Sequence, residues 1–507
     1  MGVVTQQSIK GTIANYLGVA IGFVTIFFVI TNYLSQEEVG LTRIMVDAAL
    51  LFSSIAQLGT NASIIRFFPY FKTDDDQCNH GIFGWAVLLP FVGFLIFVAS
   101  FLIFKDAIVG AYSKESPLLL DYCYLLIPLT FFALYLTVFE TNATVLMHIT
   151  VPKLVREVGI RVFNLIAYLL YGFHFISLDV FVLLFCGSYA LAMVLNLCYL
   201  FSLGKISFRI DWHFLNPPLF KDMMRYTLFM TTAGLAANIP LFNSLFLGAK
   251  TGLALTGVYT IAFNIANVVE VPYRSLGAIA RPLVAQAVKD ENWCEVNRLA
   301  QRVSLHQFLM ALLIFFFIFI NLSPLFALIP HGAEYVGGIG VVCILGLSKI
   351  VSSSLSVGFD ILNYSKKYPL TLFFNLLLAF SALFLNSVLI SFWGINGAAC
   401  STLFSYLIFY FLLLLYLRIT LKVNLFAWGH CKVVGMIAVL LLLNYLWTIT
   451  LTPLFPSTLI YTLVEAAARS LILLLLAVGA VYALHISDEI NNIIQKYYHK
   501  CFSRLDV

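Results

Sequence analysis

Long apolar runs separated by short polar segments are the dominant pattern along this chain. A run of about 20 apolar residues is long enough to cross a bilayer as an α-helix. Continuous runs of this length exclude a membrane β-barrel, whose strands alternate polar and apolar residues over about ten positions. The pattern therefore predicts an all-α polytopic membrane protein with about 14 transmembrane helices. The predicted spans are 10–34, 38–68, 80–104, 118–146, 152–173, 178–203, 221–247, 256–286, 303–329, 336–363, 367–391, 395–418, 431–452 and 457–484.

Composition points the same way. Of the 507 residues, 61% are hydrophobic and only 10% are charged, whereas soluble domains carry about 25% charged residues. The first apolar run, from Gly11 to Leu34, is longer than the apolar part of a cleavable signal peptide, so we expect it to be the first span. The nine cysteines form no C-x-x-C pair, which makes redox or zinc chemistry an unlikely function.

Lys and Arg residues are distributed unevenly between the two sets of loops. If the N-terminus is cytoplasmic, 21 of them fall on the cytoplasmic side and only Lys105, Lys114 and Lys250 on the other. By the positive-inside rule, both termini are predicted to be cytoplasmic. The net charge of +5 is spread over many loops, so nucleic-acid binding is not indicated.

Two cytoplasmic segments have the amphipathic pattern of helices that lie in the membrane interface. Residues 290–303 place Trp293, Val296, Ala300 and Val303 on one face, and the tail 487–505 has a similar apolar face. We expect both segments to be surface helices.

The second and eighth predicted spans resemble each other. The segment GLTRIMVDAALLFSSIAQLGTNASIIRF begins at Gly40, and GVYTIAFNIANVVEVPYRSLGAIARP begins at Gly257. An offset of about 217 residues corresponds to six spans, and an even number of spans keeps the orientation parallel. We therefore predict two pseudo-symmetric six-helix lobes, 1–205 (helices 1–6) and 206–422 (helices 7–12). Residues 423–507 would form helices 13–14 and the amphipathic cytoplasmic tail.

Polar side chains recur along one face of several predicted spans. At lipid depth such a face must lie against protein or water, so we predict a water-filled cavity between the lobes. Pro240 on the seventh span, which is flanked by Asn238 and Asn243, and Pro272 on the eighth are predicted to kink the helices at this cavity. The stripes are Arg43, Asp47, Ser54, Gln57 and Asn61; Asn267, Glu270, Arg274 and Arg281; and Lys349, Ser353, Ser356, Asp360 and Asn363.

An alternative interpretation is that oppositely charged residues one helical turn apart only neutralise each other. This interpretation applies to Arg43–Asp47 and to Glu270–Arg274, and a structural role is favoured for Glu157–Arg161 and Glu465–Arg469. Lys349 and Asp360 are eleven residues apart on one helix and cannot pair with each other, which favours a cavity role for both.

The motifs of hydrolases, zinc peptidases and nucleotide-binding loops are absent from the sequence. We therefore expect a protein that is not an enzyme, with no catalytic residues, no metal site and no cofactor. If the protein is a transporter, the absence of a nucleotide-binding loop means that it would use an ion gradient or the concentration gradient of its substrate. H⁺ and Na⁺ are the candidate coupling ions.

The opening stretch KGTIANYLGVAIGFVTIFFVITNYLSQEEVGLTRIMVDAALLFSSIAQLGTNASIIRFFP and the later GVYTIAFNIANVVEVPYRSLGAIARPLVA resemble the MOP (multidrug/oligosaccharidyl-lipid/polysaccharide) superfamily. The likeness is to its polysaccharide-transport branch, the Wzx-type lipid-linked oligosaccharide flippases of bacteria. It implies a V-shaped core of twelve helices with two additional helices, in the bacterial cytoplasmic (inner) membrane. It also implies alternating-access export of an undecaprenyl-pyrophosphate-linked sugar unit for O-antigen, capsule or exopolysaccharide, with membrane lipids, glycosyltransferases and a polymerase as candidate partners.

The resemblance suggests roles for the polar residues. Arg43, Arg274 and Lys349 are candidate ligands of the pyrophosphate head group, because an anion in a low-dielectric passage needs compensating charge. The other candidates are cavity residues Asn61 and Asn267, the carboxylates Asp47, Glu270 and Asp360, and the hinge residues Pro240 and Pro272. The carboxylates would bind H⁺ or Na⁺, or hold the bases neutral between cycles.

Three alternatives stay open. Charged residues in the second and eighth spans also resemble the related lipid II flippases. A cation-coupled drug or metabolite exporter is the second alternative, although the two extra helices argue against it. A membrane polymerase or ligase of lipid-linked sugars is the third, and it is disfavoured because the longest predicted extracytoplasmic loop, at Lys105–Pro117, is short.

Overall fold

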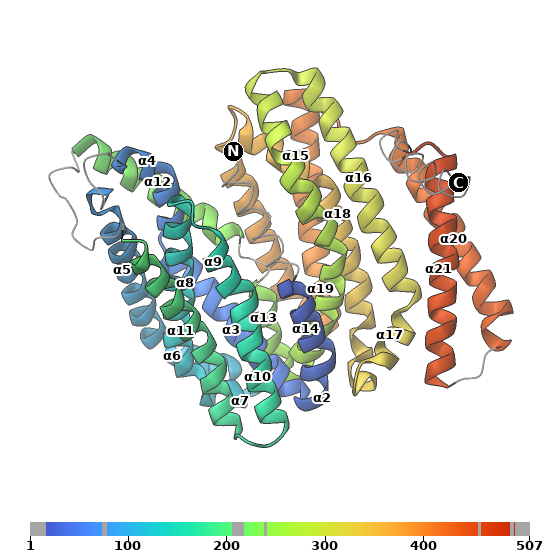
Figure 1. Ribbon diagram of the computed structural model, residues 1–507, viewed down its shortest axis with the longest axis horizontal. Coiled ribbons are helices and arrows are strands. Elements are labelled where there is room, and N and C mark those ends of the chain that lie inside the picture. Colours follow the sequence, from blue (N-terminus) through green and yellow to red (C-terminus); the bar gives the residue numbers. More distant parts are fainter. Residues whose placement is uncertain are drawn as a thin grey trace, which may run out of the picture. The chain divides into compact units, whose positions relative to one another are not determined.

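A computed structural model describes residues 17–72, 79–204, 217–237, 241–454, 458–486 and Asn491. Within these ranges the chain is helical and contains no strand (Figure 1). Ten of the described helices are long and apolar enough to cross a membrane, and Leu17–Tyr33 is a shorter apolar helix. One of the ten, Leu370–Leu421, has 52 residues and is interrupted at Gly394 (φ 54°, ψ −128°), between two predicted spans. The predicted all-α polytopic membrane fold is confirmed.

Every predicted span falls on one or more of the observed helices. The helices of the first half are η1 (Thr25–Ile30), α2 (Thr31–Tyr33), α3 (Gln36–Ala56), α4 (Thr60–Phe71), α5 (Ile82–Ile103), α6 (Lys105–Tyr112), α7 (Pro117–Asp121), α8 (Leu126–Val145), α9 (Thr150–Leu154), η4 (Val155–Gly159), α10 (Ile160–Gly172) and α11 (Leu178–Ser202). Those that follow are α12 (Pro217–Ala237), α13 (Phe242–Thr251), α14 (Leu253–Asn267), η6 (Val268–Glu270), α15 (Val271–Lys289), α16 (Trp293–Ile320), α17 (Leu322–Leu328), η7 (Gly332–Gly338), α18 (Ile339–Tyr364), α19 (Leu370–Tyr416), η8 (Leu417–Leu421), α20 (Trp428–Thr450) and α21 (Leu459–Ala483).

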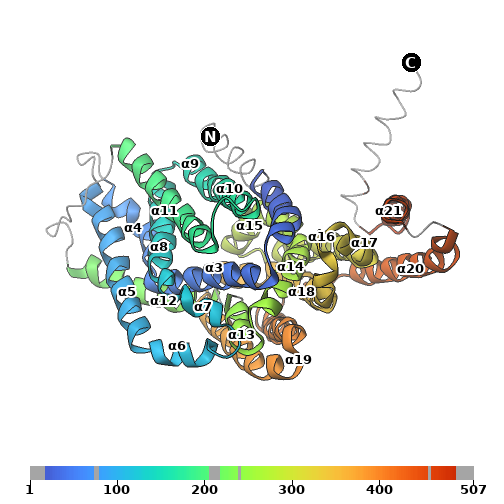
Figure 2. The same cartoon turned by 90° about the horizontal axis from the view of Figure 1, so that it is seen from below.

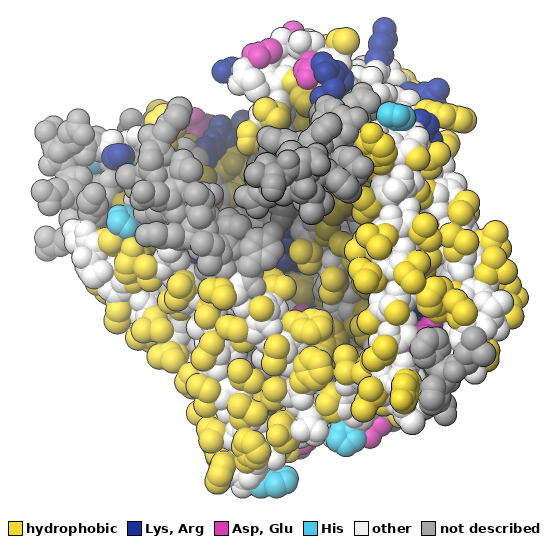
Figure 3. Space-filling view, turned by 45° about the vertical axis from the view of Figure 1, so that its right-hand side comes forward, with side chains coloured by type: hydrophobic (Ala, Val, Ile, Leu, Met, Phe, Trp, Pro, Cys, Tyr) yellow, Lys and Arg dark blue, Asp and Glu magenta, His cyan; other side chains and the backbone are white. Residues whose placement is uncertain are grey.

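The chain forms two compact units. The first comprises Met1–Ile261 with Leu378–Ala398, and the second comprises Ala262–Leu377 with Ala399–Val507. On the face shown in Figure 3, hydrophobic side chains cover most of the described surface and Lys and Arg side chains gather toward its upper end. The lobe boundaries expected from the repeat stay a prediction.

In the first unit, α3 is the most deeply buried long helix. It packs against α5, α8 and α13, and Leu41, Ile44 and Met45 on it are at most 1% exposed. The helix begins with a capping box, in which the Ser35 hydroxyl accepts from the Glu38 amide and the Glu38 carboxylate accepts from the Ser35 amide. Such a cap fixes where a helix begins, and here it fixes the register of the polar stripe that follows.

The second predicted span is broken near its middle. Leu58 and Gly59 have positive φ values of 48° and 68°, so α3 ends at Ala56 and α4 begins at Thr60. A Cβ on Gly59 would lie 2.3 Å from the carbonyl oxygen of Thr227 on α12, so α12 closely approaches the backbone at this break. The matching pair in the repeat, Leu276-Gly277, is instead continuous helix within α15. The sequence likeness at this pair therefore does not extend to conformation.

Gly40 and Gly257 occupy equivalent places in the repeat and make reciprocal close contacts. A Cβ on Gly40 would lie 2.0 Å from the carbonyl oxygen of Leu253, and a Cβ on Gly257 would lie 2.1 Å from that of Gln36. Gln36 and Leu253 are separated by the same 217 residues as the two glycines. Figure 2 shows α3 beside α14. Reciprocal contact between equivalent residues is what a two-fold relation between two parallel repeats produces.

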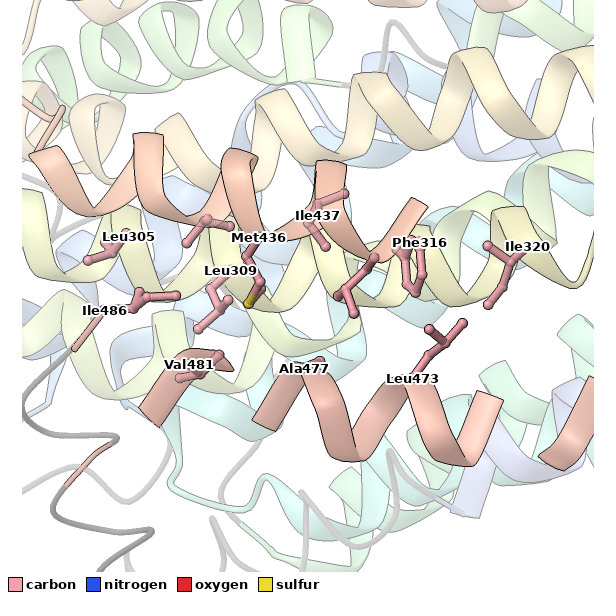
Figure 4. Close-up of a cluster of buried hydrophobic side chains, with 12 residues drawn as sticks. Leu305, Leu309, Phe316, Ile320, Met436, Ile437, Leu473, Ala477, Val481 and Ile486 are labelled. Carbon is pink, nitrogen blue, oxygen red and sulfur yellow. The ribbon is translucent and has the colours of Figure 1, made fainter. Parts of the chain in front are cut away.

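In the second unit, α15, α16 and α18 pack against one another, and α20 and α21 are attached through α16. Figure 4 shows the apolar cluster that joins α16 to these last two helices, with side chains from all three elements pointing toward one another. Its buried members are Leu305, Leu309, Phe316, Ile320, Val433, Met436, Ile437, Leu440, Leu473, Ala477, Val481 and Ile486.

The prediction of a separate interface helix at 290–303 is wrong. Residues Trp293–Ile320 form one continuous helix, α16, and Val296 and Ala300 are fully buried. The amphipathic face therefore packs against protein, as the first turns of the ninth span. The tail 487–505 lies outside the described residues, apart from Asn491.

We expect Gly40→Ala and Gly257→Ala each to lower the melting temperature in detergent. Alanine favours a helix over glycine by up to about 1 kcal/mol, but the added methyl group would overlap a backbone oxygen that cannot move aside, and such overpacking costs about 1–3 kcal/mol. Gly187→Ala is the matched control, because nothing lies within 4 Å of its added Cβ. Equal melting temperatures for all three variants would contradict the reciprocal contact.

Candidate functional site

The first unit contains a buried ion pair on α3. Arg43 Nε lies 2.6 Å from Asp47 Oδ2, and the Asp47 side chain is only 4% exposed. Ser244 Oγ on α13 donates to the same carboxylate oxygen at 2.6 Å. The interpretation that Arg43 and Asp47 neutralise each other therefore describes this structure. A carboxylate is tolerated at such a position only when it is paired and hydrogen-bonded.

A chain of polar side chains continues beyond Ser244 in the same unit. Asn243 Nδ2 donates to the Tyr259 hydroxyl at 3.1 Å, and Asn386 Nδ2 donates to Asn243 Oδ1 at 2.7 Å. These contacts connect α13, α14 and the 378–398 segment of α19. Sequence reasoning singled out Asn243 but missed Ser244, Tyr259 and Asn386, because an isolated polar residue in an apolar run carries no sign of its partner.

The second unit contains two ion pairs between neighbouring helices. Lys349 Nζ on α18 donates to Glu270 Oε2 at 2.9 Å, and Arg281 Nε on α15 donates to Asp360 Oδ2 at 3.4 Å. Each pair joins residues 79 positions apart, so the two pairs lie in one register along parallel helices. The base lies on α18 in the first pair and on α15 in the second. Lys349 and Asp360 are too far apart on α18 to pair with each other. Each is instead neutralised by a residue of the neighbouring helix.

Arg274 lies between these two pairs in sequence and is exposed. No described residue forms an ion pair or a hydrogen bond with its side chain. The expected Glu270–Arg274 pair is therefore absent from this structure, because Glu270 pairs with Lys349. This leaves one arginine uncompensated on a helix otherwise rich in apolar residues.

The helix changes its backbone geometry between Asn267 and Pro272, next to Glu270. Val268–Glu270 is a 3₁₀ turn, and the Val271 amide donates to the Val268 carbonyl. That carbonyl would lack an α-helical partner because Pro272 has no amide hydrogen. The tighter turn satisfies this carbonyl within the helix.

The remaining predicted residues are distributed over both units. Asn61, in the first unit, has a buried side-chain oxygen without a hydrogen-bond partner among the described residues. Asn267, in the second unit, is half-buried. Pro240 and Asn238 lie outside the described residues. A common cavity lined by Arg43 from one unit and Arg274 from the other stays a prediction.

Arg469 and Glu465 form a structural node on α21. Arg469 Nη2 donates to the Ile320 carbonyl at 2.9 Å and to Asn321 Oδ1 at 3.1 Å, and its Nη1 lies 3.7 Å from Glu465. Glu465 also accepts from Trp447 at 2.8 Å. The arginine caps the end of α16 and is only 5% exposed, which agrees with the structural role expected for this pair.

An apolar pocket of about 700 Å³ lies between α16, α18, α19 and α20 in the second unit. Its walls are almost entirely apolar, with Phe308, Leu355 and Phe411 among them. His430 and Ser304 contribute polar atoms and lie 3.2 Å apart, hydrogen-bonded to each other. The pocket therefore suits a hydrocarbon better than a sugar.

At the loop end of the same unit, Lys366 Nζ donates to Glu291 Oε1 at 2.5 Å. This hydrogen bond and the positive charge lower the pKa of Glu291 below its ordinary value. Within the described ranges, no group of three or more His, Cys, Asp or Glu side chains is arranged to hold a metal ion.

The family model for "Polysaccharide biosynthesis protein" matches residues 4–288, more than half of the chain. The chain belongs to this family. No curated protein matches it.

Solved structures with a similar fold are membrane transporters. A structure of the lipid II flippase MurJ in an inward closed conformation has a TM-score of 0.68 at 13% identity, covering 94% of this chain and all of that one. An inward-facing multidrug resistance MATE family transporter of the MOP superfamily has a TM-score of 0.61 at 13% identity, covering 80% of this chain and 94% of that one. A MATE transporter of Vibrio cholerae has a TM-score of 0.51 at 13% identity, covering 83% of this chain and 98% of that one. The protein is thus a multi-pass membrane protein with the fold of the MOP superfamily.

Arg469 is buried and paired, whereas Arg274 is exposed and unpaired among the described residues. Removing the charge of each should therefore change the free energy of unfolding differently. Arg469→Gln should lower the free energy of unfolding by about 3–5 kcal/mol, because Glu465 is left buried without its ionic partner. Arg274→Gln should not lower it, because this exposed side chain has no partner to lose among the described residues and its uncompensated charge is itself costly in a membrane. Thermal unfolding of the purified proteins in detergent measures both, and similar destabilisation by the two variants would contradict these assignments.

Proposed function

We propose that this protein is a flippase that moves an undecaprenyl-pyrophosphate-linked oligosaccharide across the cytoplasmic membrane by alternating access. The translocated unit would serve surface polysaccharide biosynthesis, as O-antigen, capsule or exopolysaccharide. The observation that carries the proposal is the exposed, uncompensated Arg274 on a transmembrane helix, beside bases that are already neutralised. A charge at lipid depth is costly and marks a substrate path by default.

A pyrophosphate head group supplies the charge that Arg274 lacks. A guanidinium matches phosphate oxygens bidentately and stays charged in proteins. Arg43 and Lys349 are each held by one carboxylate, Asp47 and Glu270, in the present state. Both bases would become head-group ligands once the pyrophosphate displaces that carboxylate, or once a coupling ion, H⁺ or Na⁺, binds to it. Asp360 would be the third carboxylate of this kind, through Arg281.

The apolar pocket between α16, α18, α19 and α20 supports a lipid-linked substrate over a free sugar. A polyprenyl chain gains about 0.8 kcal/mol for each CH₂ group buried from water, but it gains little by moving between two apolar environments. The pocket would therefore position a segment of the chain rather than provide affinity. The head group would account for recognition.

The proposal includes a location and partners. The excess of basic residues in one set of loops supports cytoplasmic termini and insertion in the bacterial inner membrane. Glycosyltransferases that build the oligosaccharide and a polymerase that consumes it are the proposed functional partners. The protein itself would be a transporter without catalytic activity.

A lipid II flippase is the second candidate, favoured by the structural likeness to MurJ. Both substrates share a polyprenyl pyrophosphate, so the charged residues do not distinguish them. A drug or metabolite exporter is less well supported, because cationic drugs would be repelled by Arg274.

In proteoliposomes, the wild-type protein should flip a fluorescent undecaprenyl-pyrophosphate oligosaccharide, and Arg274→Gln should slow flipping by about 10- to 100-fold. This range corresponds to the roughly 1.5–3 kcal/mol of a hydrogen bond to a charged group. Arg43→Gln combined with Asp47→Asn should also slow flipping, without leaving Asp47 as an unpaired buried charge.

Arg298→Gln is the control for this experiment. Arg298 is also exposed, but it pairs with Glu295 in the first turns of α16, so its loss should not change the rate. Flipping at the wild-type rate by Arg274→Gln would overturn the proposed head-group site. Faster flipping of lipid II than of the oligosaccharide lipid would favour the second candidate.

A further inference from the structure

Glu270 is placed within reach of two different bases, and only one of them holds it in this structure. Lys349 lies across the helix interface and binds Glu270 at 2.9 Å. Arg274 lies four residues further along the same helix, the spacing at which an acid and a following base form an intrahelical pair. Arg274 is exposed and has no ion-pair partner among the described residues. The two bases therefore compete for one carboxylate.

The backbone at Val268–Glu270 favours one of the two bases. A 3₁₀ helix advances about 120° per residue and an α-helix about 100°, so the last 3₁₀ step turns Glu270 by about 20° relative to the α-helical residues that follow, Arg274 among them. In the present 3₁₀ turn, Glu270 faces α18 and Lys349. An α-helical conformation of the same residues would bring Glu270 closer to the face that carries Arg274.

The neighbouring ion pair has contacts of its own that do not involve Glu270. Arg281 contacts Asp360 at 3.4 Å, donates to the Tyr273 hydroxyl at 2.6 Å, and lies over the Tyr273 ring at 5.4 Å from its centre. Among the described residues, Glu270 forms an ion pair only with Lys349. A change of partner at Glu270 therefore need not break the second pair.

We infer that Glu270 is a shared counter-ion that passes between Lys349 and Arg274, so that one of the two bases is always available to an anionic head group. In the present state Arg274 is available and Lys349 is neutralised. Transfer of Glu270 to Arg274 would withdraw Arg274 from the anion and release Lys349 to take it. The anion would then move along the helix pair without ever facing two unpaired bases. This inference rests on the proposed function only for the identity of the anion.

The exchange can be measured without any substrate, by a double-mutant cycle on melting temperature. In the native background, the effects of Glu270→Gln and Arg274→Gln should add, because the two side chains are not in contact. In a Lys349→Met background the effects should become non-additive, because Glu270 then pairs with Arg274. Methionine retains most of the apolar stem of Lys349. Because the substitution removes the lysine charge, Arg274 is then the base that neutralises Glu270. Asp360→Asn is the matched control background, in which additivity should persist.

Additive effects in the Lys349→Met background would overturn the inference. If that background fails to fold, Pro272→Ala supplies the second test. Restoring the amide at position 272 favours the α-helical form, and the Glu270–Arg274 coupling should then appear with Lys349 intact. No coupling in a folded Pro272→Ala background would likewise overturn the exchange.

Binding of inorganic pyrophosphate to the protein in nanodiscs tests the consequence for the anion. Arg274→Gln should weaken binding about tenfold, and so should Lys349→Met, because Glu270 then neutralises Arg274. Adding Glu270→Gln to Lys349→Met should restore binding to at least the wild-type level, whereas loss of a simple lysine ligand would not be rescued in this way. Absence of rescue would overturn the inference. Coupling in the cycle with no pyrophosphate binding by the wild-type protein would support the exchange and contradict the proposed substrate.

Discussion

Compensation of charge at lipid depth is the constraint on which the rest of this structure depends. An uncompensated ion in hydrocarbon costs several kcal/mol, and the protein meets this cost through pairs such as Arg43–Asp47 and Lys349–Glu270. The Arg469–Glu465 node shows the purely structural use of the same rule, since its members cap α16 and hold α21. Arg274 stands apart because the described residues leave it unpaired. It is therefore the position at which an external anion would complete the compensation.

The internal repeat places these charges and also limits how closely helices approach. Gly40 and Gly257 meet the backbone of each other's helix at equivalent points, which a single pair of unrelated helices would not require. The repeat does not make the two halves chemically equal. The ion pair on α3 is intrahelical, whereas those on η6 and α15 reach across to α18. The two similar segments therefore neutralise their charges differently. The first does so within one helix, and the second does so through residues of a neighbouring helix.

Much of the fold could be predicted from the sequence, because hydrophobic length and helical spacing are local signals. The helices, the repeat and the Arg43–Asp47 pair follow from such signals. The partner of Glu270 could not be predicted, since Lys349 lies 79 residues away and the intrahelical base Arg274 is the nearer choice in sequence. The 3₁₀ turn before Pro272 and the break at Leu58-Gly59 were missed because both depend on backbone geometry that residue types alone do not specify. The amphipathic face at 290–303 was assigned to the membrane surface because periodicity shows that a face is apolar, not what covers it.

The charged residues described above predict that the protein recognises the charge of a lipid-linked head group. Native mass spectrometry can compare two lipids that carry the same oligosaccharide, one through pyrophosphate and one through an uncharged glycosidic link to the same polyprenol. We expect the pyrophosphate lipid to bind at least about tenfold more tightly, because a charge-assisted contact contributes roughly 1.5–3 kcal/mol. Equal binding of the two lipids would show that the sugar or the lipid chain is recognised instead, and would contradict the account.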